Sequence, residues 1–219
     1  MKQFLLALGM AVVGTCCTDA ALGSPITFHF GGIVTSVDPL LTGTFAVGDP
    51  ISDVLTFDTA VPDTAPGPAI GMYPYISFQL QFGSYLASSL PGMNSIVSVF
   101  NEPSFDLFQA LSAFSAVGAP VNGLTLVSGA TTLLDSTHMV FNSDALPTSL
   151  NLGSFDIADT SLSFCATPGD PGNCNAHLQQ VFGNITSLSV TSSVPEPATL
   201  TLLGLGLAAL RLARRQLRV

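Results

Sequence analysis

The central part of the chain, residues 24–193, is predicted to form an all-β domain, an antiparallel β-sandwich of jelly-roll-like type. Apolar and polar residues alternate in many short segments, and a period of two is typical of a strand with one buried face. Clusters of Gly, Pro, Asn and Asp separate these segments, and such residues form turns. Helical periodicity is scarce. Many short strands joined by turns favour an antiparallel sandwich or a barrel-like fold.

The expected strands follow one another along the chain. The clearest covers residues 76–82, where apolar residues occupy every second position. The apolar residues of the other expected strands are, in order, Ile26, Phe28 and Phe30; Ile51, Leu55 and Phe57, which share a face with Asp53; Leu124 and Leu126; Met139 and Phe141; Leu162 and Phe164; and Leu188 and Val190. Only residues 104–117 fit a short helix, because phenylalanine and leucine recur there at helical spacing.

Residues 1–23 are predicted to be a secretory signal peptide. Lys2 supplies a positive charge, residues 4–13 form an apolar core, and small residues follow. The apolar run is too short for a membrane-spanning helix. Cleavage is expected after Ala21 or Gly23, and the segment implies export through the Sec translocon.

Residues 194–219 form a tail of three parts. Pro195-Glu196-Pro197 is an extended break that cannot enter the interior of a helix. An uncharged apolar run, residues 198–210, comes next and is predicted to be a transmembrane helix. The run spans only about 20 Å against a hydrocarbon core of about 30 Å, which suits a temporary hold better than a permanent one. The basic end, which is expected to stay on the cytoplasmic side, consists of Arg211, Arg214, Arg215 and Arg218.

This tail resembles the PEP-CTERM sorting signal of Gram-negative bacteria, which an exosortase recognises and cuts. The resemblance implies that exosortase is a partner and that the precursor is held transiently at the inner membrane. It also implies that the mature protein reaches the cell surface or is secreted. An ordinary C-terminal anchor helix is the alternative interpretation. Residues 41–59 look like the first hairpin of many PEP-CTERM cargo proteins, most of which have no assigned activity.

The central part of the chain contains twelve acidic residues and no lysine or arginine, because all five basic residues lie in the two terminal segments. Such a surface repels nucleic acid and anionic lipid, so no nucleic-acid partner is expected. Divalent cations are the obvious counterions outside a cell. Ca²⁺ is therefore a candidate, with Asp49, Asp53 and Asp58 as its ligands and Asp63 beside them. The alternative is a solvated acidic surface without a metal site or a cofactor.

Cys165 and Cys174 are the cysteines that remain once the signal peptide is removed. In an exported protein, a close pair that flanks a turn predicts a disulfide. The bridge is expected to stabilise a hairpin loop by about 2–3 kcal/mol. The alternative is a metal site that includes His177, but it offers only these three ligands.

The pattern of residues does not predict an active site. The histidines His29, His138 and His177 lie outside the usual metal and catalytic motifs. The central part of the chain has no Lys or Arg to bind phosphoryl or carboxylate groups, and Glu102 is its only glutamate. We therefore expect no catalytic residues and no enzyme activity.

The sequence thus predicts an exported structural or interaction protein of the cell surface or the extracellular matrix, associated with exopolysaccharide. The alternative is a secreted carbohydrate-binding module or a glycan hydrolase on a β-sandwich scaffold. Tyr73 and Tyr75 are the candidates for a small sugar-stacking edge, since the chain has no tryptophan. Tyrosines at a strand edge with their hydroxyls in water are the simpler interpretation.

Overall fold

The computed structural model describes residues 23–65, 67–89, 95–113, 116–166, 174 and 178–192. In chain order the strands and 3-10 helices are β1 (Pro25–Val37), η1 (Pro39–Leu41), β2 (Pro50–Asp58), β3 (Ile70–Pro74), β4 (Ser77–Phe82), β5 (Tyr85–Ser89), β6 (Ser95–Glu102), β7 (Phe105–Ala113), β8 (Ala116–Gly118), β9 (Thr125–Asp135), η2 (Leu152–Ser154), β10 (Ile157–Cys165) and β11 (Gln179–Ser192). The predicted signal peptide, except for Gly23, and the whole of the predicted tail lie outside the described residues. In the part that is described, no helix has the length and apolar character needed to cross a membrane.

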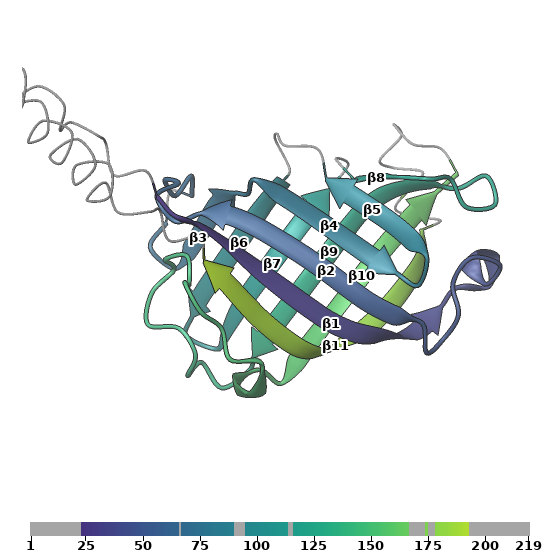
Figure 1. Cartoon of the computed structure of the whole chain (residues 1–219). Helices are drawn as coiled ribbons and strands as arrows, with labels where there is room; N and C mark the ends of the chain where they lie inside the picture. The colour runs from purple at the N-terminus through teal and green to yellow at the C-terminus, as the bar shows by residue number, and fades with distance from the viewer. Residues whose placement is uncertain are drawn as a thin grey trace, which may run out of the picture.

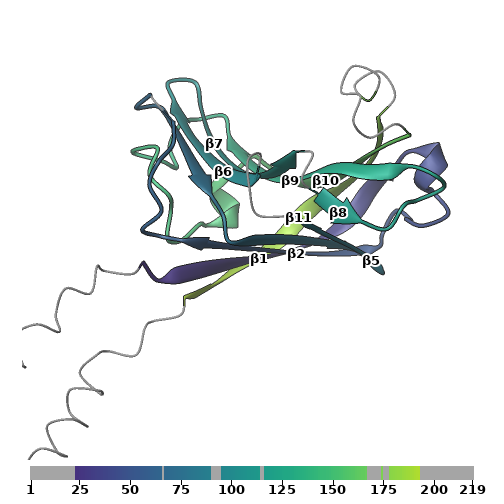
Figure 2. The same ribbon diagram turned by 90° about the horizontal axis from the view of Figure 1, so that it is seen from above.

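All eleven strands belong to one sheet, in the order β3-β6-β7-β9-β10-β11-β1-β2-β4-β5-β8. Neighbouring strands are antiparallel throughout, which confirms the predicted all-β antiparallel class. The sheet curls so that β1, β2, β4 and β5 lie across from β6, β7, β9 and β10 (Figures 1 and 2). Ladder pairing joins all eleven strands into one curled sheet, whereas a jelly roll divides its strands between two sheets, so the jelly-roll-like sandwich stays a prediction.

The longest strands, β1 and β11, pair with each other at the centre of this sheet. Their register shifts between Gly31 and Gly32, which marks a β-bulge that bends the pair. A Cβ atom on Gly32 would lie 2.1 Å from the carbonyl oxygen of Asn184, and one on Gly183 would lie 2.0 Å from Ile51 Cδ1. Glycine at these positions therefore permits the close approach that the curled sheet requires.

The core lies between the two layers and consists mainly of phenylalanine and leucine. Ile51, Leu55 and Phe57 of β2 are buried in it, as their alternation predicted. The ring of Phe28 in β1 lies 5.3 Å from that of Phe57 and 5.8 Å from that of Phe108 in β7, both edge to face. Because β1 and β7 belong to opposite layers, the contact between Phe28 and Phe108 joins the two layers of the curled sheet.

Two of the expected local structures differ from the prediction. Residues 105–113 form strand β7 and not a helix, since β6 and β9 pair with this segment on both sides. Met139 and Phe141 lie in the loop between β9 and β10 rather than in a strand. Met139 is 83% exposed, whereas the ring of Phe141 packs 6.1 Å from that of Phe155. Apolar alternation over only three residues was too short to specify a strand.

Candidate functional site

Both ends of the described domain lie side by side. Strand β1 begins at Pro25, strand β11 ends at Ser192, and Ile26 is the register partner of Ser192. We call this end of the sheet, where β11 ends beside the start of β1 (Figure 1), the tail end, because the predicted sorting tail follows Ser193 in the sequence. The sorting motif Pro195-Glu196-Pro197 and the basic end at Arg211, Arg214, Arg215 and Arg218 lie outside the described residues.

The tail end carries a long loop, residues 136–156, that is anchored by a buried carboxylate. Asp106 of β7 is fully buried. Its Oδ2 accepts hydrogen bonds from the backbone amides of Val140 and Phe141, each at 2.8 Å. Its Oδ1 lies 3.0 Å from Nδ1 of His138. The carboxylate therefore holds His138, Val140 and Phe141 in place. These residues belong to a part of the loop, before η2, that has no regular secondary structure.

A second carboxylate lies directly beside the first, because Asp106 and Asp135 are register partners in β7 and β9. Asp135 Oδ1 accepts from the amide of Thr137 at 2.8 Å and from its hydroxyl at 2.6 Å. Asp135 Oδ2 accepts from the amide of Met139 at 2.8 Å. The Thr137 hydroxyl, together with the Met139 amide, lowers the pKa of Asp135. Asp156 adds a third anchor, since it accepts from the amide and the hydroxyl of Ser136.

His138 is the residue of this loop that could take part in chemistry. It adopts a positive φ of 56°, which is uncommon for a residue other than glycine. Its side chain is 36% exposed, and its Nδ1 is paired with the buried carboxylate of Asp106. A histidine oriented by a buried carboxylate supplies two of the three members of a hydrolase triad. The contact that the structure shows for its ring is the one with Asp106, which connects His138 to β7.

The third buried carboxylate, Asp53 of β2, lies between the two layers. Its Oδ2 accepts from the hydroxyl of Thr131 in β9 at 2.8 Å and from that of Thr160 in β10 at 2.7 Å. Its Oδ1 is buried without a hydrogen-bond partner in the described part of the chain. Burial raises the pKa of Asp53 from 3.8 to about 7, while the hydroxyls of Thr160 and Thr131 and the Gln81 backbone oppose the rise. Asp53 thus links the layers by polar contacts inside an apolar core.

The candidate Ca²⁺ ligands do not come together. Asp53 is inside the core, whereas Asp49 and Asp58 lie at opposite ends of β2, about 30 Å apart at the rise of an extended strand. Asp49 accepts a hydrogen bond from the amide of Ala46, and Asp58 one from that of Ala60, each at 2.8 Å. Among the described residues, no three His, Cys, Asp or Glu side chains are placed to hold a metal ion.

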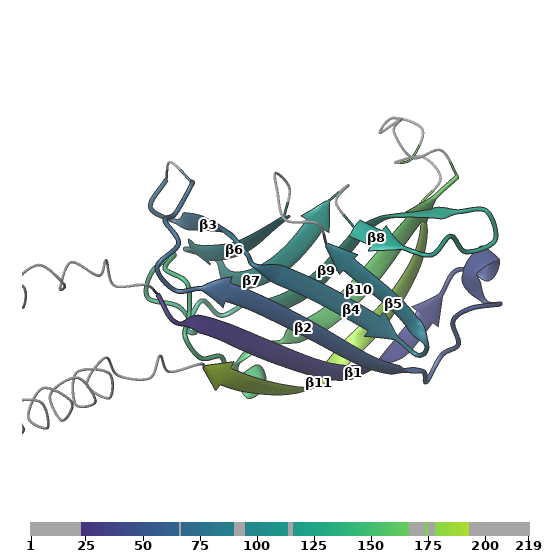
Figure 3. The ribbon, with the colours of Figure 1, turned by 45° about the horizontal axis from the view of Figure 1, so that its top comes forward.

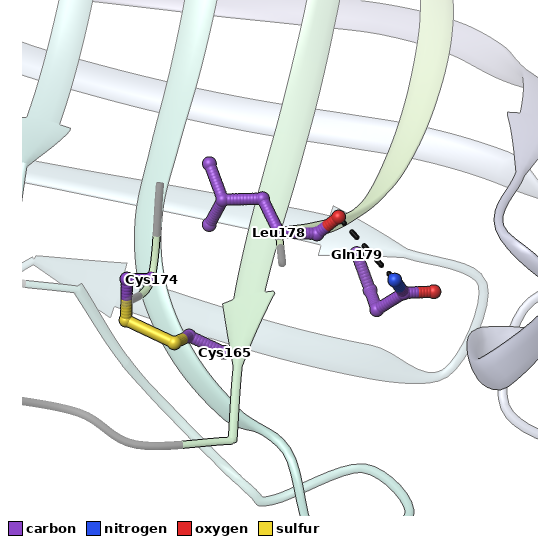
Figure 4. The surroundings of a disulfide bond; sticks show 4 residues. All are labelled: Cys165, Cys174, Leu178 and Gln179. Atoms are coloured by element: carbon purple, nitrogen blue, oxygen red, sulfur yellow. Dashed lines mark hydrogen bonds between the residues drawn. A yellow bond between two sulfur atoms is a disulfide. The ribbon is translucent and has the colours of Figure 1, made fainter. Parts of the chain in front are cut away.

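Cys165 and Cys174 form a disulfide, which confirms the predicted pair. Their Cα atoms lie 5.4 Å apart, and both residues are buried in a small cluster with Val127 and Leu178. Figure 4 shows the bridge and Leu178. The bridge closes the connection between β10 and β11 at the end of the sheet opposite the tail end. His177, the third ligand of the alternative metal site, lies outside the described residues.

All three tyrosines of the chain are buried, so Tyr73 and Tyr75 match neither the candidate sugar-stacking edge nor the simpler interpretation, in which their hydroxyls lie in water. The hydroxyl of Tyr73 donates to the carbonyl of Asp144 at 3.0 Å and that of Tyr75 to the carbonyl of Leu111 at 3.3 Å. Their hydroxyls therefore bind protein carbonyls rather than water. Tyr85 is similarly enclosed, and burial raises its pKa to about 12.

Sequence reasoning missed Asp106 because its segment was expected to be a helix, and it missed Asp135 because the strand expected at Leu124 and Leu126 was not followed as far as this residue. A signal was nevertheless present. In β7 the buried residues are Asp106, Phe108, Ala110 and Ser112, so an aspartate occupies an inward-facing position of an alternating strand. An acidic residue at such a position must find hydrogen-bond donors, and the loop that follows β9 supplies them.

Comparison with known proteins concerns the tail. Residues 193–218 match the family described as the PEP-CTERM protein-sorting motif. The match confirms the sorting signal that was predicted from the three parts of the tail. It indicates an exported protein that is processed at the membrane, with exosortase as the processing partner. No curated protein and no solved structure matches the chain.

Proposed function

We propose that the β-domain is a structural or interaction module of the cell surface or the extracellular matrix, which exosortase releases from the inner membrane by cutting its PEP-CTERM tail. The observation that carries the proposal is the sorting motif at residues 193–218, placed directly after the last residue of β11. Two residues separate Ser192 from Pro195. The domain is thus attached to its sorting signal almost without a linker.

The parts of the tail have separate tasks in this proposal. Pro195 and Pro197 keep the backbone around Glu196 extended, which is the conformation that a protease cleft accepts. The apolar residues 198–210 hold this segment at the bilayer surface, and the arginines that follow fix its orientation. Cutting at or near Pro-Glu-Pro then separates the domain from the membrane.

The proposed role as a module without enzyme activity is supported by the use that the domain makes of its polar residues. Asp106, Asp135 and Asp156 accept hydrogen bonds from the loop that they anchor. The tyrosines lie inside, and the chain has no tryptophan, so the side chains that usually stack on sugar rings are not offered. Association with exopolysaccharide is then expected through polar contacts of a broad surface rather than through an aromatic pocket.

The test uses the protein from a host that contains an exosortase. The intact mass of the mature protein should lack residues 198–219, or nearly all of them. Replacing Pro195, Glu196 and Pro197 by alanine should leave a full-length precursor at the inner membrane, because the apolar run and the arginines remain. The control Ser193→Ala should be processed normally. A mature protein that still carries Arg218 would show that the tail is only an anchor.

A second measurement tests the role of the domain. The mature protein should sediment with exopolysaccharide from the same host and should not hydrolyse it. Release of reducing sugar that is proportional to protein concentration would favour a hydrolase instead.

A further inference from the structure

The second half of β11 is a sheet edge without a neighbouring strand among the described residues, although the 3-10 helix η2 lies near β11. Strand β10 pairs with β11 only from Gln179 to Asn184, whereas β1 pairs with it as far as Ser192. Among the described residues, no strand pairs with the other side of residues 187–192. All of these residues are exposed except Leu188, which is half-buried. Figure 3 shows this part of β11 along the lower margin of the molecule, where it runs toward the tail.

The remaining edges of the sheet are protected in ways that this one is not. The edge of β3 is covered because Thr64 donates to the carbonyl of Met72 and Asp63 accepts from the amide of Met72, at 2.9 and 2.8 Å. The edge strand β8 is only three residues long. Residues 187–192 contain no charge and no proline, which are the usual means of preventing edge pairing.

We propose that this edge pairs with the same edge of a second copy of the chain. The domain has twelve carboxylates and no Lys or Arg, so two copies that meet on most faces bring like charges together. The edge at residues 187–192 is uncharged. An isologous interface uses one surface patch twice, and antiparallel strand addition supplies main-chain hydrogen bonds without requiring a basic partner.

The two-fold symmetry restricts the register of the pair. In an antiparallel pair, residues directly opposite each other lie on the same face of the sheet. The two-fold axis must therefore pass between the two copies of one residue, which lie opposite each other. When the axis passes between the two copies of Ser189, Leu188 lies opposite Val190 of the second copy, and Val190 lies opposite Leu188 of that copy. Both side chains lie on the inner face, since their partners in β1 are the buried Phe30 and Phe28. Two apolar cross-strand pairs result, in a short interface that is weak and depends on concentration.

This geometry makes pairing depend on removal of the tail, and that step rests on the proposed function. In the pair the two β11 strands point in opposite directions, and the two Ser192 residues are separated by six strand positions, about 20 Å. Residues 193–197 extend over at most about 18 Å. In the proposed arrangement each β11 points at the bilayer that holds its tail. One tail of a pair can then enter the bilayer, but the other leaves in the opposite direction and is too short to return, so two full-length chains in this orientation cannot pair in one membrane.

The test follows a Ser189→Cys variant in three preparations under mild oxidation: mature protein from an exosortase-containing host, full-length chain in membranes of a host without exosortase, and the same full-length chain in detergent. A disulfide-linked dimer is expected in the mature and detergent samples and not in the membrane sample. Ser52→Cys, an exposed position on β2, is the matched control and should remain monomeric in all three.

The outcomes separate the two proposals. Absence of a dimer in detergent would overturn edge pairing whatever exosortase does, and a dimer in the membrane sample would overturn the dependence on the tail. Failure of processing appears independently, as an unchanged intact mass.

In sedimentation of the mature protein, Ser189→Asp should abolish the concentration-dependent dimer, because it places two carboxylates opposite each other, while Ser189→Thr should retain it. Equal behaviour of these two variants would refute the register.

Discussion

Replacing Asp53 by asparagine tests how the interior of the domain tolerates a charge. The carboxylate is fully buried, and only its Oδ2 is hydrogen-bonded within the described residues. Asparagine has the same shape and stays neutral. Its carbonyl can accept from Thr131 and Thr160, while its amide nitrogen takes the position of Oδ1. The substitution therefore removes the ionisation of the site and leaves its packing unchanged.

The expected effect depends on pH. Asp53 has a pKa of about 7 in the folded protein, against 3.8 as its ordinary value. A carboxyl group whose pKa is raised on folding contributes stability below pH 3.8, and this contribution is lost as pH rises toward 7. The difference between the two pKa values corresponds to about 4 kcal/mol, at about 1.4 kcal/mol per pH unit. The free energy of unfolding of Asp53→Asn, taken relative to that of the wild type, should thus rise by about 4 kcal/mol between pH 4 and pH 8.

The measurement is urea unfolding of the mature wild-type and variant proteins at intervals from pH 4 to pH 8. Far-UV circular dichroism is the suitable signal, because the chain has no tryptophan. Taking the difference between the two proteins cancels the titration of other groups, such as Asp159, whose pKa burial also raises. A difference in unfolding free energy that stays constant over this range would refute the assignment of a raised pKa to Asp53.

Three further predictions concern stability. Thr160→Val should cost about 1.5–3 kcal/mol at pH 8, where the hydroxyl bonds an ionised carboxylate, and clearly less at pH 5; equal losses in urea unfolding at the two pH values would contradict this. Asp106→Asn should cost about 1–3 kcal/mol because it disturbs a buried acceptor of two amides, whereas the control Glu102→Gln at the half-buried end of β6 should stay within about 0.5 kcal/mol. Reduction of the disulfide should lower the unfolding free energy by about 2–3 kcal/mol, and an unchanged urea midpoint with reductant would disprove a stabilising bridge.

The fold class could be predicted because alternation is a local property of the sequence. Apolar and polar residues alternate over residues 76–82, and all of these residues except Ile76 form β4. Residues 105–113 satisfy both a helical and an alternating pattern in part, and their pairing with β6 and β9 decides between the two. Strand order depends on contacts between distant residues, such as Ile26 with Ser192. Alternation carries no information about these partners, so one curled sheet could not be distinguished from two sheets.

The sorting tail was predictable for a different reason, since its three parts are contiguous and each has a direct physical meaning. The anchoring cluster of Asp106, Asp135 and His138 combines residues that are up to 32 positions apart. It becomes visible only when β7 and β9 are known to be neighbours. For Asp53 the sequence already showed that the aspartate shares a face with Leu55 and Phe57, but not that two threonines of other strands would meet it.

The placement of both chain ends at the tail end determines how the domain responds to mechanical force. When a domain held at Ser192 is pulled from the opposite end, where the disulfide lies, the load runs along β11. The hydrogen bonds to β1, which extend from Ile26 to Val37, are then loaded in shear and must break together. Force applied between the two chain ends would instead open the same ladder one pair at a time, beginning at Ile26 and Ser192. The domain is therefore expected to be strong as a tether between envelope and surroundings, and weak when its two termini are separated.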